Sequence, residues 1–422
     1  MSTYADQLKK DLDALPASIR GIYPWLVWSC AGAFFFFQFI IRVSPNVMAN
    51  DLMRELEIHA CSLGTLSSFY YWGYTGMQIP VGLMLDSLGV KRPLAMAAFI
   101  CGLGCMLFSM TSDMMIMSAG RFMMGVGSAF GFLSCIKAGT TWFIPQRLGL
   151  IIGLSMLAGT VGATSGYAPL AILIDLTDWR TTVMILGCIC ILISMGALFV
   201  IRDRKSDSDD QGQEKASVFD GLITILKNPN TYLFGLYGSL MYLPLAAFAD
   251  LWGTPFLLQA YDVTPLEAAG SISMIYLGIG AGGPITAFLA EYFQSYKRLM
   301  VKGAALTLIM YSFIIYYPHL PFIFTYGLFF LTGILSSVQF FAFACVCELN
   351  PRCASATASG MHNMMCMISG ILFQPIVGKL LELWWDGTVV AGAPSYSTDN
   401  YFNALAVIPA SVLLAVIIGF AL

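Results

Sequence analysis

The sequence predicts an all-α membrane protein with about twelve membrane-spanning helices. Hydrophobic residues make up 58% of its 422 residues and charged residues only 11%, and the mean hydropathy is +0.76. Soluble domains carry about 25% charged residues, so this chain has too little polar surface to cover a soluble particle of its size. Its apolar runs are long enough to cross the roughly 30 Å hydrocarbon core of a bilayer.

The predicted spans form two groups of six. In order they are 23–47, 61–85, 93–110, 114–142, 148–176 and 181–201, then 231–258, 265–293, 299–317, 321–347, 354–384 and 402–422. The polar residues 202–227 form a predicted cytoplasmic linker and amphipathic lead-in between domains 1–201 and 228–422. Residues 1–20 form a polar segment without the pattern of a cleavable signal peptide. The chain ends inside its last apolar run, as a chain shortened at its C-terminus would.

The Lys and Arg residues predict the orientation, because cytoplasmic loops carry an excess of them. With the N-terminus inside, only Arg54 and Arg180 lie in outer loops, and Arg42, Arg121, Lys137 and Lys379 lie within spans. The cytoplasmic set is Lys9, Lys10, Arg20, Lys91, Arg92, Arg147, Arg202, Arg204, Lys205, Lys215, Lys227, Lys297, Arg298, Lys302 and Arg352.

The turn between the second and third spans carries the most specific pattern in the chain, formed by Gly82, Asp86, Gly89, Lys91 and Arg92. Gly89 permits a tight reversal, the two cations favour a cytoplasmic loop, and Asp86 ends a helix where nearby cations can pair with it. The pattern resembles the G-x-x-x-D-x-x-G-x-K/R-K/R signature of the major facilitator superfamily.

This resemblance implies a secondary transporter built from two six-helix bundles that are related by a pseudo-two-fold axis along the membrane normal. A weak internal repeat agrees with it, because Asp86 and Pro169 recur as Glu291 and Pro375 at nearly the same spacing. The resemblance further implies that Asp86 and Arg92 stabilise the outward-facing state through contacts at the cytoplasmic surface. The alternative is that the motif serves only as a topological signal.

Arg42 is the most informative single residue. It lies late in the first span, on the same helix face as Gln38, and Asp250 lies at a comparable depth in the seventh span, which is the repeat mate of the first. In the superfamily, helices 1, 4, 7 and 10 line the central cavity, so Arg42 and Asp250 are predicted to face each other in the outer half of the pathway. The alternative is that both snorkel to water near the outer interface.

Two further cations lie inside the fourth span. Arg121 begins an Arg-x-x-x-Gly-x-Gly element that resembles one in helix 4 of the superfamily, which implies a role in proton coupling or in holding the outer half of the domain. The alternative for Arg121 is a packing arginine that caps a neighbouring helix. Lys137 attracts carboxylates if it lies in the cavity, and otherwise snorkels to the cytoplasmic surface.

Polar and aromatic residues of other spans complete the candidate cavity, although each one alone is more often a packing residue. Tyr70, Tyr74 and Gln78 form a ladder of four-residue steps on the second span. The remaining candidates are Tyr237, Tyr242, Gln339, Asn363 and Gln374.

Other chemistries lack a signature in the sequence. It contains no Walker A motif, metal-ligand cluster or nucleophile elbow, which predicts no enzyme activity, no cofactor and no metal. No basic tract indicates nucleic-acid binding. Without an ATP site, the driving force is predicted to be a gradient of protons or another coupling ion.

The sequence therefore predicts a monomeric secondary active transporter in a bacterial inner membrane. It would act as a proton-coupled symporter that takes up a small anionic or zwitterionic solute, such as an amino acid or small peptide, by alternating access. One alternative is an exporter of a drug or siderophore. Another is a membrane receptor or scaffold that does not transport.

Overall fold

The computed structural model describes residues 21–202, 225–350 and 355–422, except positions 262, 294, 319 and 391. Segment 1–20 and positions 203–224 of the linker lie outside the described residues, so the predicted domain boundaries remain a prediction. The all-α class is confirmed, because helices account for nearly all of the described chain.

The first half runs from α2 to α10. Its elements are α2 (Tyr23–Val47), α3 (Ala49–Glu55), α4 (Ala60–Leu88), α5 (Lys91–Met110), α6 (Met114–Ser128), α7 (Gly131–Trp142), the 3-10 turn η1 (Pro145–Arg147), α8 (Leu148–Ser165), α9 (Ala168–Leu176) and α10 (Trp179–Val200). The helix α4 ends at Leu88 and is followed by Gly89, whose φ of +73° lies in the region that glycine tolerates best. The fifth predicted span is divided into α8 and α9, and Pro169 lies in the first turn of α9, where a missing N–H costs little.

The second half runs from α12 to α20. Its elements are α12 (Pro229–Leu243), the π-helix η3 (Pro244–Trp252), α13 (Gly253–Tyr261), α14 (Pro265–Phe293), α15 (Tyr296–Tyr316), α16 (Ile323–Ser336), the 3-10 turn η4 (Ser337–Gln339), α17 (Phe340–Glu348), α18 (Ser355–Leu383), β1 (Val389–Val390), β2 (Ala393–Pro394), α19 (Thr398–Leu405) and α20 (Val407–Ala421). The strands form an antiparallel hairpin in which Val389 pairs with Pro394.

Among the described residues, 11 segments are long and apolar enough to cross a membrane. The helix α4 is a further candidate for a span, because its 29 residues equal the length of the segments Met114–Trp142 and Pro265–Phe293. Its Tyr, Ser, Thr and Gln residues lower its hydropathy, and several of them contact other helices instead of lipid. Counting α4 gives the predicted twelve spans.

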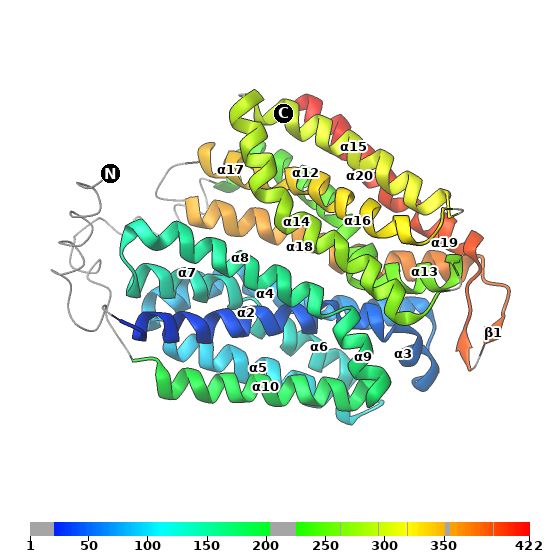
Figure 1. Ribbon diagram of the computed structural model, residues 1–422, viewed down its shortest axis with the longest axis horizontal. Coiled ribbons are helices and arrows are strands. Elements are labelled where there is room, and N and C mark those ends of the chain that lie inside the picture. Colours follow the sequence, from blue (N-terminus) through cyan, green and yellow to red (C-terminus); the bar gives the residue numbers. More distant parts are fainter. Residues whose placement is uncertain are drawn as a thin grey trace.

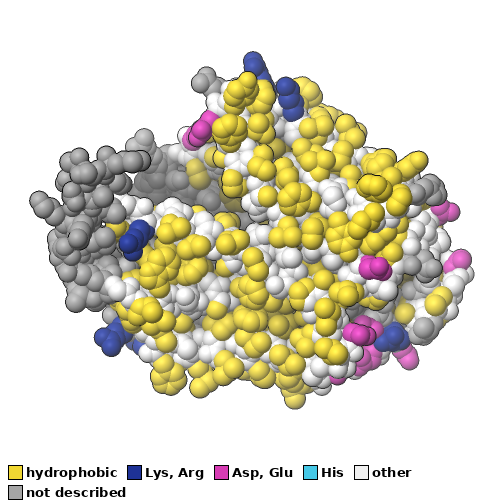
Figure 2. Space-filling view, viewed as in Figure 1, with side chains coloured by type: hydrophobic (Ala, Val, Ile, Leu, Met, Phe, Trp, Pro, Cys, Tyr) yellow, Lys and Arg dark blue, Asp and Glu magenta, His cyan; other side chains and the backbone are white. Residues whose placement is uncertain are grey.

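The two halves form two bundles that lie side by side, with α2 to α10 in one and α12 to α20 in the other (Figure 1). We call the end that carries α3, β1, β2 and α19 the hairpin end, and the opposite end, which carries the Gly89 turn, the motif end. Apolar side chains cover the middle of the visible face in Figure 2, where most Lys and Arg stand at the left and top edges and most Asp and Glu at the right. This distribution suits a particle whose middle is surrounded by lipid.

The bundles meet closely between the hairpin end and the middle of the membrane-spanning helices. In this half α4 crosses α18, and α2 packs against η3. Among the described residues, the interbundle hydrogen bond nearest the motif end joins Gln78 to Asn363. The structure is therefore closed at the hairpin end.

Candidate functional site

A buried ion pair joins the two bundles. The Nε atom of Arg42 on α2 donates to Oδ2 of Asp250 on η3 at 3.0 Å, and the two side chains are 4% and 0% exposed. Burying an isolated charge is costly, so each of these ions depends on the other. The structure thus brings together the two residues that the sequence singles out, and any separation of the bundles at this level must break the pair.

Two tyrosines complete the surroundings of the Asp250 carboxylate. Tyr71 on α4 donates to Oδ2 and Tyr276 on α14 donates to Oδ1. The Tyr71 hydroxyl also accepts from Nη2 of Arg42 at 3.3 Å. Together with Arg42, these phenols give the carboxylate three hydrogen-bond donors from three different helices. A buried carboxylate needs such donors in place of water.

Aromatic rings surround the guanidinium of Arg42. Its central carbon lies 5.2 Å from the ring centroid of Tyr71, 5.4 Å from that of Tyr242 and 5.7 Å from that of Phe39. Within about 6 Å, such rings attract a cation through their quadrupoles. The π-helix η3 places Asp250 beside the guanidinium that these three rings surround. Such π-helical turns are often found at functional sites.

A second network lies next to the pair and also bridges α2 and η3. The Asn46 amide donates to the backbone oxygens of Phe248 and Ala249 and accepts from the Thr254 amide at 3.1 Å. The Tyr167 hydroxyl donates to the same Ala249 oxygen at 2.8 Å. Side chains of the first bundle therefore bind backbone groups in the middle of η3 and at the start of α13.

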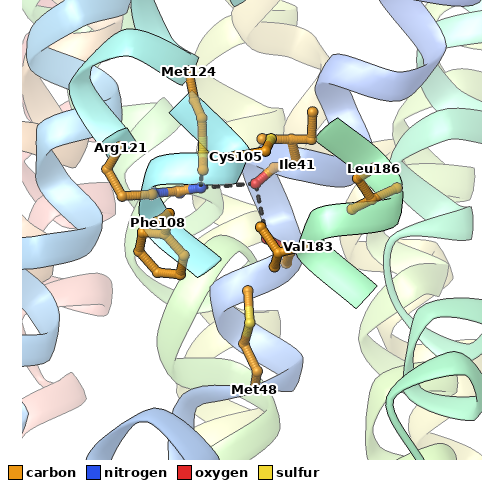
Figure 3. Close-up of a pocket in the computed structure, with 9 residues that line it drawn as sticks. Ile41, Met48, Cys105, Phe108, Arg121, Met124, Val183 and Leu186 are labelled. Carbon is orange, nitrogen blue, oxygen red and sulfur yellow. Dashed lines mark hydrogen bonds between the residues drawn. The ribbon is translucent and has the colours of Figure 1, made fainter. Parts of the chain in front are cut away.

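Arg121 supports the backbone that carries Arg42. Pro45 has no N–H, so the Ile41 oxygen four residues earlier in α2 lacks its helical donor. Arg121 Nη1 donates to this oxygen at 2.9 Å, and Nη2 donates to the Arg42 oxygen at 3.3 Å, as Figure 3 shows for Ile41. The pocket beside Arg121 is too narrow to admit a water molecule. This geometry favours a positioning role over ligand binding.

Two other predicted site residues, Gln78 and Asn363, bond across the bundle interface, and a third, Gln374, bonds inside the second bundle. Asn363 Nδ2 donates to Gln78 Oε1 at 2.8 Å, which links α18 to α4. Gln374 Nε2 donates to the Ala246 oxygen at 2.8 Å, and the Gln374 backbone oxygen accepts from Trp252 at 3.1 Å. Both Gln374 contacts join α18 to η3 inside the second bundle, so Gln374 supports the segment that carries Asp250.

Other predicted cavity residues lie elsewhere. The Tyr70 hydroxyl donates to Oε1 of Gln38 at 2.9 Å, and its ring stacks on that of Tyr74. All three residues belong to the first bundle, so Tyr70 faces α2 and not the other bundle. The Tyr237 hydroxyl donates to the Met300 oxygen at 2.9 Å, in the core of the second bundle. Gln339 is buried in η4, and its Nε2 has no hydrogen-bond partner among the described residues.

Lys137 is not a free cation of the cavity. Its Nζ lies 2.7 Å from Oδ1 of Asp86, and the two side chains are 23% and 76% exposed. The motif aspartate therefore pairs with a cation from the neighbouring α7. Lys91 and Arg92 begin α5, and a Cβ on Gly82 would have no neighbour within 4 Å.

The sequence interpretation missed Tyr71, Tyr276, Asn46 and Tyr167. For Tyr71 a signal was present, because Tyr71, Tyr74 and Gln78 also recur at helical spacing. The prediction began the ladder at Tyr70, which faces α2 of its own bundle, instead of at Tyr71, which faces the other bundle. For Tyr276, Asn46 and Tyr167, a single aromatic or amide in an apolar run gave no comparable pattern.

Comparisons with known proteins agree with this architecture. The family model described as Major Facilitator Superfamily matches residues 28–374. A solved structure of a bacterial homologue of the human lysosomal transporter Spinster, in an inward-facing and occupied conformation, superimposes with a TM-score of 0.74. It is 16% identical, and the match covers 95% of this chain and 97% of that one.

Three curated relatives are also named as transporters. An uncharacterized transporter of Bacillus subtilis, YybO, is 29% identical over 40% of this chain and 39% of its own length. A probable sulfoacetate transporter of Cupriavidus necator, SauU, is 24% identical over the same shares. A probable hexose phosphate transport protein of Chlamydia trachomatis is 20% identical over 84% of both chains.

The match to this chain therefore spans about two fifths of the first two relatives and most of the third. The family model is decisive, because it covers most of the chain and the fold agrees with it over nearly the whole length. The chain belongs to the major facilitator superfamily and is an integral, multi-pass membrane protein.

Proposed function

We propose that this protein is a secondary transporter that takes up a small organic anion together with a proton, and that Arg42 and Asp250 couple the movement of the anion to that of the proton. The observation that carries the proposal is the buried Arg42–Asp250 pair at the bundle interface. Two relatives that are named for sulfoacetate and hexose phosphate support an anionic substrate, because both compounds are organic anions.

The coupling follows from competition for one guanidinium. While Asp250 is charged, it occupies Arg42, and a substrate anion has no cation to bind. A proton on Asp250 removes the competing charge and leaves Arg42 available to the substrate. Arginine suits this role because its planar fork matches carboxylate and phosphate oxygens. An inward proton gradient would then drive accumulation of the anion.

A zwitterion, such as an amino acid or small peptide, is the second candidate, and one observation favours it. The pair presents a cation and an anion side by side, so the carboxylate of a zwitterion can bind Arg42 while its ammonium binds Asp250. This mode needs no proton on Asp250. Dependence of uptake on a pH gradient therefore separates the two candidates.

The orientation belongs to the same proposal. Described cations gather at the motif end: Lys91, Arg92, Arg147, Arg202, Lys227, Lys297, Arg298 and Lys302. By the positive-inside rule this end is cytoplasmic, and the hairpin end then faces outward from a bacterial inner membrane. The structure would correspond to the state closed to the outside, with substrate released to the cytoplasm.

Uptake by proteoliposomes tests the proposal after a thermal-shift screen has selected a substrate from sulfonates, sugar phosphates, sugar acids and amino acids. We expect Arg42→Gln to abolish both accumulation and exchange of the anion. Asp250→Asn should retain exchange of external for internal substrate but lose accumulation driven by a pH gradient. Each variant leaves one buried charge unpaired, at a cost of about 3–5 kcal/mol, so melting temperatures are measured alongside uptake.

The surface pair Arg54–Asp51 provides the matched control, because its ions are separated by 2.6 Å but are much more exposed. Arg54→Gln and Asp51→Asn should transport like the wild type. Gradient-driven accumulation by Asp250→Asn at the wild-type rate would contradict the coupling mechanism. Absence of flux for every compound that shifts the melting temperature would instead favour a receptor or scaffold, and accumulation only in the opposite direction would favour an exporter.

A further inference from the structure

The helix α4 begins without a cap of its own. Its N-cap residue is His59, whose side chain makes no capping hydrogen bond. The first amides of a helix have no helical acceptor, and Ser, Thr, Asp or Asn usually supplies one. In this helix Leu63 is the first residue whose amide is bonded by the preceding turn, to the His59 oxygen at 3.0 Å.

The missing acceptors come from the other bundle. Oε1 of Glu382, at the end of α18, accepts from the Cys61 amide at 2.8 Å. The Tyr396 hydroxyl, next to the β hairpin, accepts from the Ala60 amide at 3.0 Å. A carboxylate at a helix N-terminus also interacts favourably with the positive end of the helix dipole.

The surrounding contacts hold these two acceptors in place. Trp385 donates from its indole to the oxygens of Thr388 and Ser395, which closes the hairpin, and its ring packs against Tyr396 at 5.9 Å. The same indole meets the ring of His59 edge-on at 5.0 Å. The cap is therefore a built feature of the hairpin end, where Glu382 is only 22% exposed.

We propose that Glu382 and Tyr396 form an interbundle cap on α4 that stabilises the state closed at the hairpin end. Separation of the bundles at this end removes both acceptors and leaves the α4 amides to water. The cap thus lowers the free energy of the hairpin-closed state relative to the hairpin-open state, and this contribution does not depend on the substrate or on the Arg42–Asp250 pair. Weakening it should move the population toward the state that is open at the hairpin end.

The test measures that population directly. Nitroxide labels at Met115→Cys and Ile323→Cys, in a full-length background whose other cysteines are replaced, report the separation of the bundles in a pulsed-EPR distance distribution. Met115 is 82% and Ile323 71% exposed, and they begin α6 and α16 in different bundles. Neither residue contacts the cap.

We expect Glu382→Ala to raise the ratio of hairpin-open to hairpin-closed molecules roughly tenfold, equivalent to about 1.4 kcal/mol, as for loss of a helix N-cap. Glu382→Gln should have a smaller effect because its amide oxygen still accepts a hydrogen bond. Tyr396→Phe keeps the ring and removes only the hydroxyl, so we expect a shift of roughly threefold.

Asp386→Asn is the matched control, because this carboxylate lies just after α18, four residues beyond Glu382, but accepts from the Thr388 amide within its own turn, at 2.9 Å. Its distance distribution should equal that of the parent. Melting temperatures identify any variant that fails to fold. If Glu382→Ala fails to fold, Tyr396→Phe still tests the proposal. Unchanged distributions in folded Glu382→Gln and Tyr396→Phe, or an equal shift in Asp386→Asn, would overturn the cap.

Discussion

At the scale of single residues, Arg121 and Pro45 depend on each other. The Ile41 oxygen accepts from Arg121 Nη1 at 2.9 Å because Pro45 cannot supply the usual helical donor. Ser44 Oγ donates to the same oxygen at 3.0 Å. Arg121 is 2% exposed and, among the described residues, contacts carbonyl oxygens and the ring of Tyr70 but no carboxylate. Its charge is therefore used to fix the backbone of α2.

This relation predicts a non-additive pair of substitutions. Arg121→Met should destabilise the protein by about 1.5–3 kcal/mol, because a buried oxygen loses a charged donor. Pro45→Ala restores an N–H to that oxygen, so the same Arg121→Met change should cost less in the Pro45→Ala background. A double-mutant cycle on denaturant-induced unfolding measures the difference. Equal costs in both backgrounds would show that Arg121 does not substitute for the missing donor.

The same scale shows where residue-by-residue prediction from the sequence succeeded and where it stopped. Arg42 and Asp250 were recognisable because a charge inside an apolar run is costly and needs a partner. Tyr70 and Tyr71 are adjacent, however, and only one of them faces the other bundle. Helical spacing alone could not choose between them, because the direction of the interface depends on packing against α18.

At the scale of elements, the crossing of α4 and α18 depends on two glycines. A Cβ on Gly64 would overlap the Gln374 oxygen, and a Cβ on Gly378 would overlap the Ala60 oxygen. Both obstacles are backbone atoms of the opposite helix, which cannot move aside as a flexible side chain can. Small residues permit this close approach between helices in a membrane.

We therefore expect Gly64→Ala or Gly378→Ala to separate α4 from α18 at the hairpin end. The native Cys61, whose Cα would lie 2.9 Å from a Cβ on Gly378, is the reporter. Its alkylation by a membrane-impermeant maleimide, located by peptide mass spectrometry, should be several-fold faster in these variants. Gly76→Ala on the same helix is the control, since a Cβ there meets nothing within 4 Å. If the control alkylates faster than the parent, or if the two test variants alkylate at the parent's rate, the two glycines do not hold α4 close to α18.

The helices themselves were largely predictable, and their irregularities were not. Apolar length located the spans to within a few residues, because a bilayer fixes how long each helix must be. The π-helix η3 was not predicted, although it carries Asp250. Its backbone is stabilised by Asn46 and Tyr167 of the other bundle, so its geometry depends on tertiary contacts that no local pattern encodes.

At the scale of the whole molecule, the asymmetry of charge connects the fold to its orientation. Described cations gather at the motif end, whereas Arg54 and Arg180 lie at the hairpin end, where Arg180 pairs with Glu55 at 2.6 Å. Cytoplasmic loops carry the excess of Lys and Arg in membrane proteins. The distribution of charge therefore predicts that the motif end lies on the cytoplasmic side of the membrane and the hairpin end on the outer side.

Cysteine labelling in intact cells tests this orientation. Val390 is 59% exposed on the hairpin, and Lys297 lies exposed at the start of α15, at the motif end. In a background whose native cysteines are replaced, a membrane-impermeant maleimide should label Val390→Cys in intact cells and Lys297→Cys only after the membrane is opened. Both sites should react equally in detergent, which controls for local accessibility. If Lys297→Cys reacts from outside while Val390→Cys is protected, the hairpin end faces the cytoplasm, and the structure is then closed on the cytoplasmic side instead of the outer one.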